Sequence, residues 1–253
     1  MNAQSAETAA RLLVDARRSG RKLAALPPDC RPADIAGAYA IQDATLRAIG
    51  PIGGWKVGAA SPDAEPGCAP LPASGIMASP LSLPSAQYGL LGIETEIAFK
   101  FARDLPPRAA PYTRAEVLAA VGSLHPVIEV VDTRYADMKA QDPLSLLADL
   151  QSHAALVVGP ARTSDLAIDQ TKQHVRQMFD GAVSAERTGG NTAGDVLRIV
   201  TWLANHVTQR AGGLKAGQIV TSGSCTGMMP TRPGSTVRSE LAGLGAVEIR
   251  FTT

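Results

Sequence analysis

The segment Gly92–Phe101 reads GIETEIAFKF, in which the side chains alternate between two kinds. Apolar residues and Thr95 fill the odd positions, while Glu94 and Glu96 fall between them, which predicts a strand with two distinct faces. Residues two apart on a strand project from one face and lie roughly 6.5–7 Å apart along the backbone, at about 3.3 Å per residue. Both carboxylates can therefore reach a single ion, although a solvated polar face is the more ordinary interpretation of such a pair.

A third carboxylate lies inside an apolar run, Pro126–Asp132 (PVIEVVD), which predicts a buried strand. Burying the ionised Glu129 alone would cost several kcal/mol, so either a positive charge compensates it or the strand is an edge that lets it reach water. Together with Glu94 and Glu96 it makes three carboxylates with no histidine or cysteine cluster. Such a ligand set suits Mg²⁺, Mn²⁺ or Ca²⁺ better than zinc.

Lys56 lies in the glycine-flanked run Gly53–Gly58 (GGWKVG). Three carboxylates against a divalent ion leave one negative charge, which Lys56 could offset while it also holds an anionic substrate. Beside a cation its pKa is expected to be lowered, which would suit acid–base chemistry near neutral pH. The alternative is a surface lysine next to a buried tryptophan.

A hydroxyl-rich and glycine-rich run follows a short apolar stretch near the C-terminus, Thr221–Gly227 (TSGSCTG). Ser222, Ser224 and Thr226, with the exposed amides of the glycines, would form a cradle for a carboxylate or keto oxygen. A plain glycine-rich turn is the alternative. No Gly-Lys-Ser/Thr ending and no GxGxxG occurs, so the sequence gives no support for nucleotide binding.

The flanking segments are expected to combine helices with short strands. Thr113 and Glu116 form a capping box that predicts a helix start, and Gly122 can end that helix. Residues 60–86 hold six prolines, which predicts a long irregular loop. Other expected elements are a basic surface helix within 5–26, helices over 34–50 (with Ile35 on the apolar stripe) and 192–210, strands over 156–159, 218–222 and 246–251, and helical positions for His174 and His206.

Strands scattered among loops, without regular strand–helix alternation, favour a mixed and mostly antiparallel α+β fold. We expect a helical N-terminal region over residues 1–52 and a β-rich catalytic domain over residues 53–253. Both regions together fit within the size of one large domain with a small extension.

Composition excludes several classes of function. A formal net charge of +1 leaves no basic field for nucleic acid or an anionic membrane surface. No window reaches the roughly 18 consecutive apolar residues of a membrane span, and the N-terminus lacks the pattern of a secretory signal. Three widely spaced cysteines, with no CxxC, suggest neither a disulfide framework nor a zinc cluster, so a cytoplasmic location is expected.

The order of five motifs resembles the fumarylacetoacetate hydrolase superfamily, in particular its 2-keto-4-pentenoate hydratase and 4-oxalocrotonate decarboxylase branch. The motifs are GWKVG, IETEIAF, PVIEVVD, GQIVTSGSCTG and GLGAVEIRF, and the resemblance covers about residues 34–253. It implies a mixed β-roll or barrel with flanking helices, a homo-oligomer, and Mg²⁺ or Mn²⁺ held by Glu94, Glu96 and Glu129. Lys56 matches the active-site lysine of the family.

The resemblance also implies a substrate class, short 2-oxo or 2-hydroxydienoate acids from the breakdown of aromatic compounds. The expected reaction is addition of water to a 2-hydroxy-2,4-dienoate, giving a 4-hydroxy-2-oxo acid. Two departures concern the catalytic groups: Gly67 lies where we expect an acidic residue, and Asp149–His153 lacks the usual asparagine, for which Ser152 or His153 would substitute.

Three alternatives remain open at this stage. A 2-oxo-acid decarboxylase of the 4-oxalocrotonate type would need the same metal site. An acylpyruvate hydrolase is less favoured, since no Asn-Tyr-x-x-His element precedes Glu94. The third is a non-catalytic protein that binds 2-oxo acids.

Overall fold

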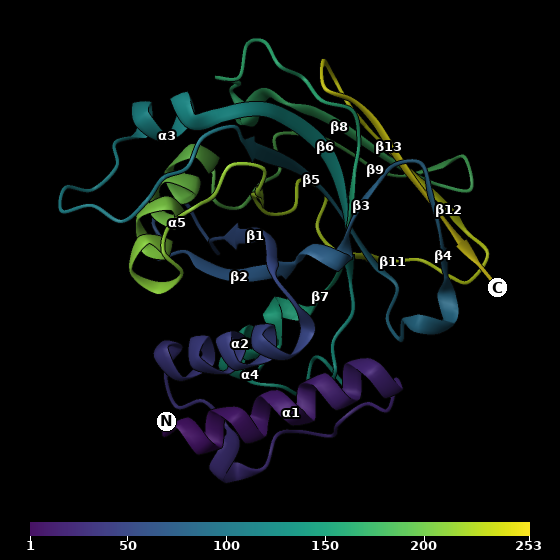
Figure 1. Cartoon of the computed structure of the whole chain (residues 1–253). Coiled ribbons are helices and arrows are strands. Elements are labelled where there is room, and N and C mark those ends of the chain that lie inside the picture. The colour runs from purple at the N-terminus through teal and green to yellow at the C-terminus, as the bar shows by residue number, and fades with distance from the viewer.

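The computed structural model describes residues 1–253 and shows two β-sheets with helices packed around them (Figure 1). The larger, eight-stranded sheet has the order β2-β1-β10-β5-β6-β7-β3, and β11 pairs with β5 outside this path. This sheet is curled, and we call its concave side the inner face (Figure 1). Its strands are β1 (Ile52–Gly58), β2 (Gly67–Pro72), β3 (Ile76–Ala78), β5 (Gly92–Phe101), β6 (Val121–Val131), β7 (His153–Val158), β10 (Ile219–Thr221) and β11 (Met229–Pro230).

The second sheet has five strands in the order β4-β13-β12-β8-β9 and packs against the outer face of β5, β6 and β7. Side chains such as Ile93, Ile128 and Phe251 fill the space between the sheets and are fully buried. This hydrophobic layer holds the two central strands in place. The strands of the second sheet are β4 (Leu81–Pro84), β8 (His174–Phe179), β9 (Ala182–Thr188), β12 (Thr236–Leu241) and β13 (Gly245–Thr252).

Five α-helices complete the fold: α1 (Ala3–Ser19), α2 (Ile35–Ile49), α3 (Arg114–Ala120), α4 (Pro143–Ala148) and α5 (Val196–Arg210). Helices α3 and α5 cover the main apolar core, while α1, α2 and α4 pack together at the other end of the molecule (Figure 1). No helix combines the length and the apolar character that a membrane crossing would need.

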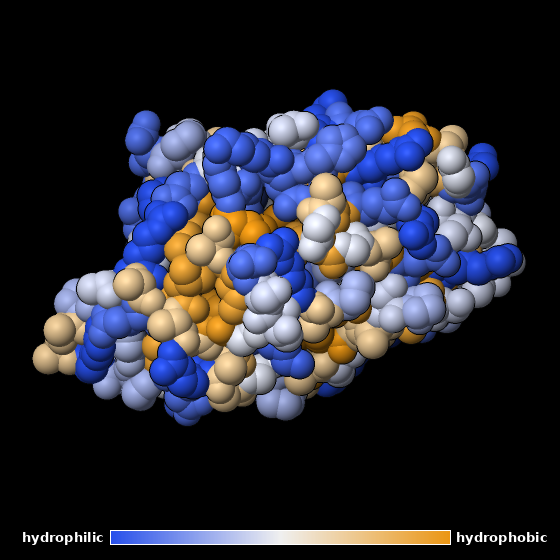
Figure 2. Space-filling model, turned by 90° about the horizontal axis from the view of Figure 1, so that it is seen from above, coloured by the Kyte–Doolittle hydropathy of each residue, from blue (hydrophilic) through white to orange (hydrophobic).

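The predicted α+β class is confirmed, and eight of the eleven strand pairings are antiparallel, as expected. Strand β5 spans the quoted stretch from its first residue to its last, and α3 begins with the predicted capping box. Figure 2 shows one face of the molecule, on which hydrophilic side chains surround an apolar area.

Four expectations about secondary structure are wrong. Residues 60–86 include three strands, β2, β3 and β4, each at a sheet edge, where a missing N–H costs no ladder hydrogen bond. Gly122 lies inside β6, because α3 ends at Ala120. His174 lies in β8 rather than in a helix, and the side chain of Ile35 is 51% exposed, off the apolar stripe of α2.

Candidate metal and acid-binding site

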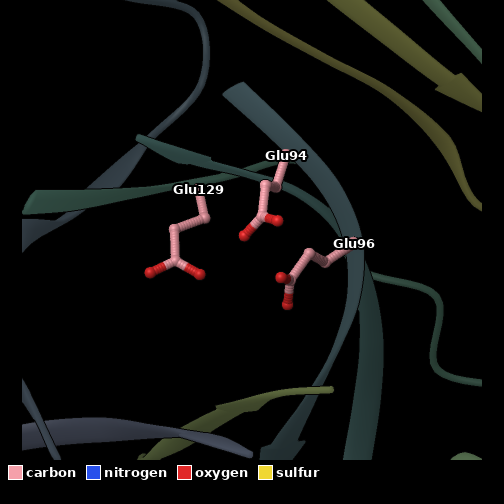
Figure 3. A group of neighbouring side chains, drawn as sticks. All are labelled: Glu94, Glu96 and Glu129. Carbon is pink, nitrogen blue, oxygen red and sulfur yellow. The ribbon is translucent and has the colours of Figure 1, made fainter. Parts of the chain in front are cut away.

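The three glutamates meet on the inner face of the curled sheet (Figure 3). Glu94 and Glu129 are direct cross-strand partners between β5 and β6, and Glu96 follows two residues along β5 on the same face. One carboxylate oxygen from each lies within 4.8 Å of the others. Glu96 and Glu129 are buried, at 1% and 0% exposure, and Glu94 is partly exposed.

The charges of this cluster are only partly compensated. Burial, with Glu129 close by, raises the pKa of Glu94 to about 7 against the opposing effect of Lys56. Burial, with Glu129 and Glu94 nearby, raises the pKa of Glu96 to about 8. Both groups therefore hold protons at mildly acidic pH in the metal-free protein.

Glu129 is kept ionised by two groups that contact the same oxygen. Lys56 donates from Nζ to Oε1 at 2.7 Å, and His153 donates from Nδ1 at 2.9 Å. Burial alone would raise the pKa of Glu129, but Lys56 and His153 outweigh it, and the pKa is lowered. Its second oxygen, Oε2, is buried and has no hydrogen-bond partner, so it is free to coordinate a cation.

Lys56 behaves differently in the metal-free protein from the expectation of a lowered pKa. Burial does lower it, but the attraction of Glu129, Glu94 and Glu96 is stronger, and the net pKa is raised. Lys56 is therefore a cation at neutral pH. In this state it offsets one carboxylate and can attract an anion, but it cannot act as a base.

A pocket of about 350 Å³ opens beside the cluster. Of the predicted substrate-binding residues, only Ser224 lines it. Ser222 is fully buried and donates its hydroxyl to the carbonyl of Ile97, and Thr226 faces the backbone of Thr95. The polar side chains that line the pocket are Lys56, Glu94, Glu96, Gln151, Asn191, Thr192 and Ser224.

The loop after β10 holds Glu96 as well as lining the pocket. The amide of Gly223 donates to Glu96 Oε2 at 2.9 Å, and the hydroxyl of Thr221 donates to the same oxygen. Asn191 in turn supports this loop, donating from Nδ2 to the carbonyls of Ser222 and Gly223 at 2.8 and 2.9 Å. The glycine-rich run thus positions one carboxylate of the cluster, a role that the sequence did not suggest.

Gln151 and Asn191 line the pocket but were missed at the level of sequence. Gln151 lies in a turn in which Leu150, Gln151 and Ser152 all have positive φ, between 50° and 59°. This left-handed turn directs the carbonyl of Gln151 to Lys56 at 3.2 Å and its side chain into the pocket. The sequence signal that could have pointed to Asn191 as a loop residue at the site is the pair of glycines before it in TGGNT.

Ser152 and His153, by contrast, lie behind the cluster. Both are buried, at 1% and 0% exposure, and neither lines the pocket. Burial lowers the pKa of His153 to about 4 despite its hydrogen bond to Glu129, so the ring is neutral at pH 7. The catalytic roles expected of these two residues stay predictions, but their position suits support of Glu129 rather than contact with substrate.

The donor set fits a hard divalent cation. Three carboxylates converge with one ammonium beside them, and burial, together with repulsion from the neighbouring carboxylates, raises the pKa of Glu94 and Glu96. All the candidate ligands are oxygen atoms, and the only neighbouring imidazole points its Nδ1 at Glu129. These features favour Mg²⁺ or Mn²⁺ over zinc.

Comparison with known proteins supports the resemblance. The family described as fumarylacetoacetate (FAA) hydrolase C-terminal matches residues 40–252. A 2-keto-4-pentenoate hydratase of Burkholderia vietnamiensis (strain G4 / LMG 22486) is 31% identical, over 98% of this chain and 97% of its own.

Two solved structures show how far the fold is shared. 4-Oxalocrotonate decarboxylase from Pseudomonas putida G7, complexed with magnesium and adipate, has a TM-score of 0.87 at 24% identity, over 99% of this chain and 98% of that one. Fumarylpyruvate hydrolase from Pseudomonas aeruginosa, in complex with Mn²⁺ and pyruvate, has a TM-score of 0.57 at 16% identity, over 78% and 88%. The predicted fold is thereby confirmed, and the chain belongs to the fumarylacetoacetate hydrolase family.

Proposed function

We propose that this protein is a metal-dependent hydratase that adds water to a 2-hydroxy-2,4-dienoate and yields a 4-hydroxy-2-oxo acid. The observation that carries the proposal is the cluster of Glu94, Glu96 and Glu129 beside Lys56 at the edge of a small polar pocket. The 31% identity to a 2-keto-4-pentenoate hydratase along nearly the whole chain supports the choice of reaction.

Glu94, Glu96 and Glu129 would hold Mg²⁺ or Mn²⁺. When bound, the cation would supply a Lewis acid for the carboxylate and the neighbouring 2-oxo oxygen of the substrate. The solved relatives that carry adipate with magnesium and pyruvate with Mn²⁺ support a small acid as the ligand.

The side chains that line the pocket would orient the acid and offset its negative charge. The Lys56 ammonium is positioned to attract the substrate carboxylate. Gln151 offers a buried Oε1 with no partner and Ser224 a hydroxyl, while Asn191 supports the pocket wall through its hydrogen bonds to Ser222 and Gly223. His153, through Nδ1, holds Glu129 in place, and Ser152 lies beside it, so we propose positioning roles for both.

Decarboxylation is the second candidate, because a 4-oxalocrotonate decarboxylase shares the fold over nearly the whole chain, with a TM-score of 0.87. Both reactions need the same chelated acid. They differ in the product, since only decarboxylation releases carbon dioxide.

The test is a spectrophotometric assay of 2-hydroxypenta-2,4-dienoate with purified protein, in EDTA and then with Mg²⁺ or Mn²⁺ added back. We expect loss of dienoate absorbance only with the metal, a 4-hydroxy-2-oxo acid as product and no carbon dioxide. Glu96→Gln should abolish turnover, while Glu186→Gln, on the exposed surface of β9, should leave it unchanged. Turnover that persists in EDTA, or in a Glu94→Gln, Glu96→Gln double variant, would refute the mechanism.

A further inference from the structure

A second polar pocket, of about 520 Å³, lies between the C-terminal end of α1 and the turn over residues 85–89. It shares no lining residue with the pocket beside the glutamates. Four basic side chains and one acidic side chain line it: Arg17, Arg18, Lys22, Arg134 and Asp132. We call it the basic pocket.

Two of the four cations are neutralised within the protein. Lys22 pairs with Asp132 at 2.6 Å, and Arg134 pairs with the buried Asp149 at 2.5 Å. The other oxygen of Asp132 accepts a hydrogen bond from the amide of Leu90, so both of its oxygens already have partners. The acidic groups near the basic pocket are therefore already used.

The other two cations, Arg17 and Arg18, have no carboxylate partner. Arg17 donates to the carbonyl of His153, and Arg18 donates to the carbonyl of Ala48 at 2.9 Å. Burial, reinforced by repulsion from Arg134, lowers the pKa of Arg17 to about 10. A guanidinium held in this way carries an electrostatic cost that an anion in the pocket would relieve.

The residues in the wall of the basic pocket pack closely against one another. Lys22 crosses over Gly89 on its way to Asp132, and a Cβ at position 89 would lie 2.9 Å from Lys22 Cε. Gly20, at φ +70°, ends α1 and turns the chain toward Lys22. Glycine at both points allows the basic groups to converge.

We propose that the basic pocket is a second ligand site, which binds a small organic dianion through a carboxylate or phosphate group held by Arg17 and Arg18. The planar guanidinium fork matches both groups in geometry, and an unpaired arginine can form both hydrogen bonds without breaking an ion pair. The volume is in the range that takes small ligands. His153 links this site to the glutamates, because its carbonyl accepts from Arg17 and Arg134 while its ring contacts Glu129.

The experiment is isothermal titration of the full-length, EDTA-treated protein with inorganic phosphate and, separately, with succinate, at low ionic strength. Lys56 is the cation that lines the pocket beside the glutamates, so binding that persists in a Lys56→Gln variant reports the basic pocket. We expect saturable binding of one equivalent of at least one of the two anions, and the tighter one indicates whether phosphate or carboxylate is the natural group. The double variant Arg17→Gln, Arg18→Gln should weaken binding at least tenfold.

Two further variants keep the test decisive. Arg18→Gln alone changes an exposed side chain, so it should fold normally and still weaken binding severalfold. Arg11→Gln, on an exposed position of the same helix, should leave binding unchanged. Absence of saturable binding to the wild-type protein, or equal affinity in all variants, would overturn the proposal. A second result would also overturn it: the wild-type protein binds neither anion but self-associates, and Arg17→Gln abolishes that self-association. In that case acidic side chains of a second copy, rather than a small anion, would occupy the pocket.

Discussion

Glu94 and Glu96 make metal binding depend on pH. Their pKa values, raised by burial to about 7 and about 8, mean that a cation must displace protons from both. Between pH 6 and pH 8 the affinity for Mn²⁺ should therefore rise by a factor on the order of 10². Titration of Mn²⁺ by electron paramagnetic resonance across this range measures it. An affinity that does not change with pH would show that the two carboxylates are not ligands.

The ring of His153 provides a second test. Its ring hydrogen-bonds to Glu129, as groups that orient metal ligands commonly do. Loss of such a group typically weakens metal binding roughly 10- to 100-fold. We expect that loss for Mn²⁺ in His153→Phe. His153→Asn can place an amide N–H near the position of Nδ1 and should recover most of the affinity. Equal affinities in the two variants would argue that the ring only fills space.

Among the structural elements, the loop over 189–192 and the loop after β10 meet closely at Gly190, next to the hydrogen bonds of Asn191. A Cβ at Gly190, which has φ +96°, would lie 2.3 Å from the carbonyl oxygen of Cys225. Gly190→Ala should push the loop over 189–192 away from the loop after β10, lower stability by about 1–3 kcal/mol and reduce turnover. Gly181→Ala is the matched control, since Gly181 also has positive φ but open space around it. It should lose stability to a similar or smaller extent in chemical denaturation and keep full turnover.

The elements also show what the sequence could and could not predict. Alternation over Gly92–Phe101 and the capping box at Thr113 are local signals, and both were sufficient. The strands within 60–86 could not be predicted in this way, because a proline is tolerated only where the sheet order leaves an edge. The position of Gln151 depends on the left-handed turn before β7. The family resemblance pointed to its neighbours Ser152 and His153 instead.

For the whole molecule, the same site links stability to pH in two opposite directions. His153 has a lowered pKa, so the unfolded chain binds its proton more readily, and stability is lost as pH falls from about 6.5 towards about 4. Glu94 and Glu96 have raised pKa values, so the folded chain holds their protons longer. Their contribution is full below about 4.5 and is lost as pH rises through about 7 and about 8.

Above pH 6.5 only the carboxylate effect remains within this site, so the metal-free protein should melt several degrees lower at pH 8.5 than at pH 6.5. A bound cation takes the place of the displaced protons, so Mn²⁺ should raise the melting temperature more at pH 8.5 than at pH 6.5. Scanning calorimetry in EDTA and in Mn²⁺ at the two pH values measures both effects. Other groups also titrate in this range. The double variant Glu94→Gln, Glu96→Gln separates their effect on the melting temperature from that of the two glutamates. If that variant shows the same fall in melting temperature as the wild-type protein, the glutamates are not its cause, because they no longer carry the protons that folding retains.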